Sequence, residues 1–337
     1  MTSRAFIAGC SGLALTSGET AFFREAAPWG FILFARNIDT PDQVRALVEQ
    51  LRAAVGWRAP VLIDQEGGRV QRLRPPHWPD YPPAEPFGAL YLTDPESAVA
   101  AVRMNSRAIA ADLIALGIDV DCLPCADLRH PDGHGIIGNR AYGSQPQAVA
   151  ALARAAAEGL LQGGVLPVVK HIPGHGRAPA DSHERLPVVH APRAELEGMD
   201  FAAFRALADI PLGMTAHVVY ADIDPDAPAT TSRIMMDEVI RGSIGFSGLL
   251  MSDDLSMGAL AGDLADRGKA AIAAGCDMLL HCNGRLDEMT AVAAAAPILS
   301  GIALERAERA LALRITPEPV DRDALRAEVA RRIAAAA

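Results

Sequence analysis

The sequence lacks clusters of lysine and arginine. Its 337 residues include 31 basic and 41 acidic side chains, which gives a formal net charge of −10 at pH 7. Nucleic acids and anionic membranes attract proteins through clustered basic residues, so the composition argues against both as partners. It is typical of a soluble protein whose copies repel one another, and we therefore expect a monomer.

Cysteine is also scarce. The five cysteines are an odd number spread through a long chain, which is not the pattern of a disulfide framework, and a reducing compartment fits better. Cys122 and Cys125 form a C-x-x-C motif, but it lies in the apolar run DVDCLPCADL with no second pair and no adjacent histidine. Buried thiols in a strand are therefore favoured over redox chemistry or a zinc site.

Long apolar runs are missing as well. No stretch reaches the roughly 18 uninterrupted apolar residues of a membrane-spanning helix. The apolar run before Cys10 is shorter than the core of a signal peptide, which needs about 7 to 15 apolar residues, and it predicts a first β-strand instead. The sequence therefore predicts a cytoplasmic protein without a membrane partner.

The sequence instead contains eight short apolar runs rich in β-forming residues. Between them lie Ala- and Leu-rich stretches with helix signals, such as Thr40 as a cap and Pro41 in the first helical position. The runs are RAFIAGCSG, GFILFAR, PVLIDQE, GIDVDCLPCADL, VLPVVKHIPGHG, IPLGMTAHVVY, GLLMSDDLS and CDMLLHCN. Strands that are apolar on both faces and alternate with helices indicate a parallel sheet, and eight of them close most economically as a (β/α)8 barrel. A doubly wound α/β sheet is the alternative.

No Gly/Ser-rich linker or charge block divides the chain, so we expect a single barrel domain over residues 1–337. The Ala- and Arg-rich ending from about residue 320 predicts a helical tail. Polar side chains fall at the carboxyl ends of the apolar runs, where barrel enzymes place their active sites. These residues are Asp64, Asp127, Lys170, His171, His217, Asp253 and Asn283.

The segment KHIPGHGRAPADSHERLP, residues 170–187, concentrates three histidines, and three functions are open to it. A zinc pair would need His171 and His175 on one helix, but Pro173 between them forbids a regular helix. A phosphate cradle would need a Gly-rich turn that opens a helix, whereas Pro179 and no helix-forming run follow the glycines. Neither a metal site nor a phosphate site is favoured.

The third function is that of an acid/base loop. Asp181 and His183 are separated by one residue, so in an extended loop their side chains lie on the same side and can hydrogen-bond. An aspartate that accepts one imidazole N–H leaves the other nitrogen free to carry a proton. An isolated pair of this kind is more often an incidental surface contact, but this loop follows a strand that ends in Lys170 and His171.

Two further stretches add carboxylates and cations. The run LLMSDDLS ends in Asp253 and Asp254, which point to opposite sides of a strand, so only one of them faces the barrel mouth. The stretches DQEGGRVQR and GNRAYG supply polar groups that can bind hydroxyls. These groups are Asp64, Arg69, Arg72 and Arg140. Together with an aromatic content of only 5%, they suit a small polar sugar. The residues alone leave open which aspartate and which of the first two arginines take part.

Five separated motifs resemble a known family. In chain order they are DQEGGRVQR, GNRAYG, KHIPGHG, DSH and SDDLSM. They are similar in sequence and order to motifs of the β-N-acetylglucosaminidases of glycoside hydrolase family 3, specifically the short, single-domain bacterial type. The resemblance extends from the first predicted strand to CDMLLHCN, which is nearly the whole chain.

The resemblance implies a retaining exo-glycosidase that needs no cofactor or metal. Its implied reaction removes the non-reducing GlcNAc from GlcNAc-1,6-anhydroMurNAc muropeptides in the cytoplasm during cell-wall recycling. Asp253 matches the nucleophile that forms a covalent glycosyl-enzyme intermediate, His183 the general acid/base and Asp181 its partner. The positions that match those holding the sugar are Asp64, Arg72, Arg140, Lys170 and His171.

Other functions remain as alternatives. A glycoside phosphorylase acting on β-GlcNAc glycosides is the main one, because an imidazole repels an anionic phosphate less than a carboxylate does. A family 3 glucosidase of other specificity is disfavoured, since the wider family usually takes a carboxylate acid/base from an additional domain. A non-catalytic binding barrel is disfavoured because every proposed catalytic group is present.

Overall fold

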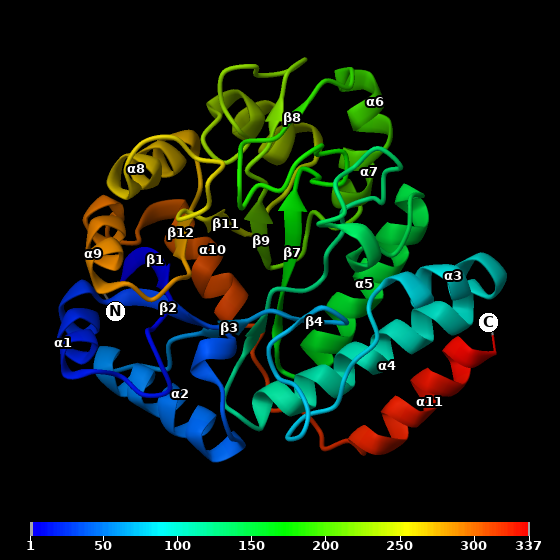
Figure 1. Ribbon diagram of the computed structural model, residues 1–337, viewed down its shortest axis with the longest axis horizontal. Coiled ribbons are helices and arrows are strands. Elements are labelled where there is room, and N and C mark those ends of the chain that lie inside the picture. The colour runs from blue at the N-terminus through cyan, green and yellow to red at the C-terminus, as the bar shows by residue number, and fades with distance from the viewer. Residues whose placement is uncertain (1–2, 336–337) are drawn as a thin grey trace.

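The computed structural model describes residues 3–335 and shows a closed barrel of eight parallel strands (Figure 1). Around the barrel the strand order is β1-β12-β11-β9-β7-β6-β3-β2. Their bounds are β1 (Arg4–Ala8), β2 (Pro28–Leu33), β3 (Val61–Ile63), β6 (Val120–Asp121), β7 (Leu166–Ile172), β9 (Leu212–Thr215), β11 (Leu249–Asp254) and β12 (Met278–His281). Each strand overlaps one of the eight predicted runs. The predicted (β/α)8 barrel is therefore confirmed, and the doubly wound sheet is excluded because the sheet closes on itself.

Helices surround the barrel (Figure 1). Their bounds are α1 (Ser17–Ala26), α2 (Pro41–Val55), α3 (Glu85–Thr93), α4 (Pro95–Ile114), α5 (Pro146–Gln162), α6 (Arg193–Gly198), α7 (Asp200–Arg205), the π-helix η3 (Met235–Ser243), α8 (Leu264–Ala274), α9 (Leu286–Ala295), α10 (Gly301–Leu311) and α11 (Arg322–Ala334). The α2 helix begins as predicted, because the Thr40 side chain accepts from the backbone N–H of Gln43 and Pro41 follows it. Within residues 3–335 no helix is long and apolar enough to cross a membrane.

Alternate side chains of the strands divide between two apolar cores. On β1, Ile7 belongs to the core that fills the barrel, whereas Phe6 belongs to the core between barrel and helices. On β2, Ile32 and Leu33 divide in the same way. This period-2 pattern with both faces buried explains why the strands read as continuous apolar runs. The five cysteines are all free and buried. Cys122 and Cys125 are thus buried thiols as expected, but they follow β6 and do not lie in the strand.

The last helix of the described residues packs against an earlier one. The α11 helix lies beside α4 in Figure 1, and Arg322 donates a 2.6 Å hydrogen bond to Asp112 of α4. The predicted tail is therefore a helix that packs on α4 at the outside of the barrel.

Several connections at the carboxyl ends of the barrel strands contribute to the candidate site, including those after β3, β7 and β11. A short hairpin of β4 (Gln65–Gly67) and β5 (Val70–Gln71) follows β3. Residues 173–187, which we call the acid/base loop, follow β7. Residues 255–260, which we call the docking turn, follow β11. This is the face at which barrel enzymes bind their substrates.

Candidate functional site

A cavity of about 400 Å³ opens at the carboxyl ends of the strands. Its volume falls in the range of roughly 300 to 1,000 Å³ that is usual for small-molecule sites. Seven of the eight residues singled out from the sequence line it: Asp64, Arg72, Arg140, Lys170, His171, His183 and Asp253. The eighth, Asp181, lies behind His183. The structure therefore brings together side chains from five separate parts of the chain.

Two carboxylates, one buried and one largely buried, hold the cations of the cavity in place. Asp64 accepts from Lys170 at 2.8 Å and from Arg72 at 2.9 Å. Glu66 accepts two hydrogen bonds from Arg140, at 2.9 and 2.7 Å, and lies 2.7 Å from the Lys170 ammonium. Paired in this way, the long side chains of the three cations are held in fixed positions.

The charges of this network are stable near neutral pH. Burial alone would raise the pKa of Asp64, but Lys170 and Arg72 hold it well below its usual range. Burial likewise opposes ionisation of Glu66, yet Arg140 and Lys170 lower its pKa to about 2. The pKa of Lys170 is raised despite its burial, because Asp64 and Glu66 surround it. These groups can bind hydroxyls, and they are poorly suited to transfer protons.

His171 is held by a third carboxylate. Its Nδ1 lies 2.6 Å from Asp127, which also accepts from the backbone N–H of His175 at 2.6 Å. Burial would raise the pKa of Asp127, but the imidazole of His171 holds it well below its ordinary value. With Nδ1 engaged, Nε2 of His171 is the nitrogen left for a ligand in the cavity.

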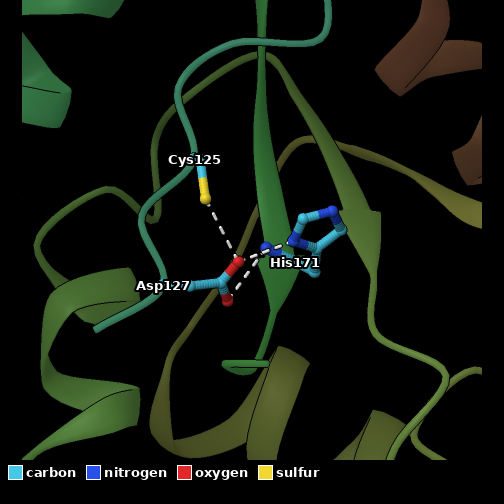
Figure 2. Close-up of side chains that lie close together, drawn as sticks. All are labelled: Cys125, Asp127 and His171. Atoms are coloured by element: carbon cyan, nitrogen blue, oxygen red, sulfur yellow. Dashed lines mark hydrogen bonds and ion pairs between the residues drawn. The ribbon is translucent and has the colours of Figure 1, made fainter. Parts of the chain in front are cut away.

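The same residues form a cluster of metal-ligand types. In Figure 2, Asp127 lies between Cys125 and His171, and one ligand atom of each lies within 4.8 Å of the others. The carboxylate already accepts from both neighbours, with the Cys125 thiol at 3.3 Å. Burial raises the pKa of that thiol well above its ordinary value, which disfavours the thiolate that binds metals. We interpret the cluster as a hydrogen-bonded support for His171, and the expectation of no metal stays a prediction.

The two adjacent aspartates at the end of β11 differ in their surroundings. Asp254 accepts from the Ser256 hydroxyl at 2.6 Å and from the backbone N–H groups of Ser256 and Cys282 at 3.1 and 3.2 Å. Asp253 accepts from the backbone N–H of Asp254 at 2.8 Å. Burial would raise the pKa of Asp253, but the imidazoles of His171 and His217 lower it below its ordinary value. Both aspartates line the cavity, so the expectation that only one of them faces the barrel mouth is wrong. The carboxylate of Asp254 is engaged by Ser256 and Cys282, whereas that of Asp253 is ionised and accepts only from the backbone N–H of Asp254 among the described hydrogen bonds.

Asp181 and His183 form the hydrogen-bonded pair that their spacing predicts. The backbone N–H of His183 donates to one carboxylate oxygen of Asp181 at 2.9 Å. Its ring Nδ1 hydrogen-bonds to the same oxygen at 2.7 Å. Burial would raise the pKa of Asp181, but the hydrogen bonds from His183 lower it. The His183 side chain is 64% exposed. Its Nε2 is thus free to exchange a proton at the mouth of the cavity.

The structure also distinguishes the two arginines that sequence reasoning could not. Arg72 reaches the cavity, and its guanidinium lies over the ring of Phe34 at 5.1 Å. Arg69 points away and donates to the backbone carbonyls of Gly135, at 2.9 Å, and Ile137, at 3.3 Å. Arg69 therefore has a structural position that shapes a neighbouring loop.

Glu66 is the residue that sequence reasoning missed. It stands in the quoted DQEGGRVQR motif, but its partners Arg140 and Lys170 are far along the chain, and nothing local marks it as their counterion. Asp127 was predicted at the carboxyl end of an apolar run. Its pairing with His171 could not be predicted, because only the fold brings the two residues together.

Comparison with known proteins identifies the family. The glycosyl hydrolase family 3 N terminal domain matches residues 26–313. A beta-hexosaminidase of Alkalilimnicola ehrlichii is 43% identical over 284 residues, which cover 82% of this chain and 79% of that protein. A beta-hexosaminidase of Bordetella avium is 38% identical over 316 residues, which cover 93% of this chain and 85% of that protein.

A solved structure agrees with this assignment. The structure of NagZ from Neisseria gonorrhoeae in complex with N-trifluoroacetyl-D-glucosamine matches with a TM-score of 0.87 at 32% identity, covering 100% of this chain and 99% of that one. The resemblance inferred from the five motifs is thus confirmed across the barrel. The chain belongs to glycosyl hydrolase family 3 and is a glycoside hydrolase.

Proposed function

We propose that this glycoside hydrolase is a retaining exo-β-N-acetylglucosaminidase. The observation that carries the proposal is that an ionised carboxylate, Asp253, and a carboxylate-held imidazole, His183, line the same cavity. A retaining glycosidase needs one nucleophile and one acid/base at the scissile bond. The relatives named beta-hexosaminidase support N-acetylhexosamine as the sugar.

The two steps of the reaction follow from these groups. Asp253 attacks the anomeric carbon, the bond to the leaving oxygen breaks, and Nε2 of His183 gives that oxygen its proton. The product of this step is a covalent glycosyl-enzyme ester. In the second step the neutral imidazole takes a proton from water, whose oxygen attacks the anomeric carbon and releases Asp253 as a carboxylate. Two inversions give net retention of the β configuration.

The charged side chains of the cavity would hold one terminal sugar. Carboxylates accept hydrogen bonds from hydroxyls, and the cations donate to sugar oxygens. Asp64, Glu66 and Asp127 fix the positions of the cations and of His171. Binding of the sugar would therefore cost little side-chain entropy. The residues assigned to this task are Asp64, Arg72, Arg140, Lys170 and His171.

The natural substrate we propose is a muropeptide, GlcNAc-1,6-anhydroMurNAc with its peptide, hydrolysed in the cytoplasm during cell-wall recycling. The support is the motif resemblance to the short bacterial enzymes and the likeness to NagZ from Neisseria gonorrhoeae. Its test compares kcat/KM for GlcNAc-anhydroMurNAc and for chitobiose. A preference for chitobiose would contradict the muropeptide assignment and leave the glycosidase assignment intact.

The mechanism is tested by hydrolysis of 4-nitrophenyl β-N-acetylglucosaminide with and without inorganic phosphate, followed by NMR of the first-formed sugar. We expect β-GlcNAc to appear first, at the same rate in both buffers. A GlcNAc 1-phosphate product would instead identify a phosphorylase, for which the histidine acid/base is the favourable feature. First-formed α-GlcNAc would contradict the nucleophilic role of Asp253.

A further inference from the structure

The hydrogen bonds within the Asp181–His183 pair fix the imidazole relative to its own loop and leave its distance from Asp253 undetermined. That distance depends on where the acid/base loop rests. In the structure the loop rests on the docking turn, the segment that directly follows the nucleophile strand β11. The backbone N–H of Gly258 donates to the carbonyl of His183 at 3.0 Å, and that of Ala259 donates to the carbonyl of Ser182 at 3.1 Å.

Hydrogen bonds from neighbouring elements hold the docking turn in place. At its start, Asp254 accepts from Ser256, as described above. From α8, Arg267 donates to the carbonyls of Leu255 at 2.7 Å and Met257 at 3.1 Å. These contacts tie the turn to two elements of the barrel, so the loop rests on a surface whose position relative to Asp253 is fixed.

Gly258 is the point of closest approach between turn and loop. A Cβ atom at this position would lie 2.6 Å from the carbonyl oxygen of Glu184 and 2.9 Å from that of His183, which is closer than carbon and oxygen can pack. Gly258 lies outside the left-handed backbone region, so its own conformation does not require glycine. It is also exposed to solvent. The contact that a side chain would disturb is therefore the one with the acid/base loop.

A side chain of the loop provides a second attachment. The hydroxyl of Ser182 lies 3.0 Å from Nε2 of His175, and both residues are buried. Burial lowers the pKa of His175 to about 4, so the ring is neutral near pH 7 and forms an uncharged hydrogen bond with Ser182. The backbone of His175 donates to Asp127, which holds His171. The resting position of the loop is thus connected to the sugar-binding side of the cavity.

We propose that the docking turn is the receptor for the acid/base loop, and that Gly258 is a positioning residue that sets His183 at its working distance from Asp253. Gly258 acts through the loop and contacts neither substrate nor reacting atoms. The proposal rests on the proposed function, because it takes His183 as the acid/base of that reaction.

The test is Gly258→Ala, measured as kcat/KM for two aryl β-N-acetylglucosaminides. The dinitrophenyl glycoside has a good leaving group that needs little protonation, whereas the phenyl glycoside depends on the acid. A general acid/base group typically accelerates a reaction by about 10² to 10⁴-fold. Displacement of His183 should therefore lower kcat/KM by roughly 10-fold or more for the phenyl glycoside and by less than about 2-fold for the dinitrophenyl glycoside. Equal losses on both substrates, or no loss on either, would overturn the proposal.

Gly198→Ala is the matched control. Gly198 is also exposed and outside the left-handed region, but an added Cβ there meets nothing within 4 Å. We expect unchanged kinetics for this variant. In a His183→Ala background, Gly258→Ala should have no further effect, because two changes that act through the same group are not additive. A further loss of similar size in that background would also overturn the proposal.

Two measurements keep the test decisive if Gly258→Ala does not fold. Ser182→Ala leaves the docking turn unchanged and removes the attachment to His175, so it should produce the same dependence on the leaving group to a smaller degree. Hydrogen exchange of the wild-type protein should show protected amides at residues 258 and 259. Unprotected amides would mean that the loop does not rest on the turn. Wild-type protein that hydrolyses neither glycoside would refute the proposed function itself, a result distinct from all of these.

Discussion

Replacing Glu66 by glutamine should destabilise the protein by an amount that the structure allows us to work out. The glutamine keeps the shape of the side chain but removes the charge that Arg140 and Lys170 share. The pKa of Glu66 falls from an ordinary 4.5 to about 2 in the fold. Lowering a pKa by one pH unit corresponds to about 1.4 kcal/mol, so this lowering of the pKa contributes about 3 kcal/mol to the free energy of unfolding. Breaking a buried ion pair by removing one partner typically costs about 3 to 5 kcal/mol, which agrees.

This loss should be visible in the melting temperature. At about 2.1 cal/mol/K per residue, the unfolding entropy of 337 residues is about 0.7 kcal/mol/K. A loss of about 3 kcal/mol therefore lowers the melting temperature by about 4 °C. Calorimetry at pH 7 measures it. As a control, Glu158→Gln removes one charge from a half-exposed pair with Arg103 and should cost no more than about 1 kcal/mol.

The pH dependence gives a sharper test. Because the pKa of Glu66 is lower in the folded than in the unfolded protein, its stabilisation is complete above about pH 4.5 and is lost as the pH falls toward 2. The difference in melting temperature between wild type and Glu66→Gln should therefore be full at pH 7 and narrow steadily below pH 4.5. A difference that stays constant down to about pH 3 would refute the assignment of Glu66 as a charged counterion.

Three further predictions concern the reaction. Asp253→Ala should lower kcat by at least about 10³-fold while the sugar still binds, as measured by calorimetric titration, and substantial residual turnover would mean that another group is the nucleophile. His183→Ala should reduce kcat/KM far more for phenyl than for dinitrophenyl glycosides, and equal losses would point to a structural role. Arg72→Ala should raise KM by about 10-fold or more through the loss of a charged hydrogen bond, whereas Arg69→Ala should change it by less than about 2-fold, and the reverse order would contradict the placement of these side chains.

The barrel was predictable because its signal is local. The strands are buried on both faces, so each appears as a short apolar run. Of the polar residues predicted at the ends of these runs, Asp64, Lys170, His171, Asp253 and Asn283 line the cavity, whereas Asp127 and His217 are not among its lining residues. The Asp181–His183 pair was predictable for the same reason, since two residues in one loop determine it. These features depend on spacing within a few residues.

The choice between neighbouring candidates was not predictable from spacing. Asp253 and Asp254 are adjacent, and what distinguishes them is that Asp254 accepts from the backbone N–H of Cys282, which directly follows the neighbouring strand β12. Arg69 and Arg72 differ because the carbonyls of residues 135–137 lie beside one and the carboxylate of Asp64 beside the other. Such partners are far apart in the sequence, and only the closed barrel brings them together.

The charge of the cavity gives a physical reason for a histidine acid/base. A carboxylic acid can protonate a leaving group near neutral pH only if its pKa is raised. The cations of the cavity act in the opposite direction on their partners, because they lower the pKa values of Asp64 and Glu66. Asp64 and Glu66 are therefore ionised near neutral pH and cannot donate a proton. An imidazole exchanges protons near neutral pH without such tuning, and a place on an exposed loop keeps it outside the buried network. In the proposed reaction, the carboxylate-paired cations therefore hold the sugar, and the proton comes from a histidine that lies outside their network.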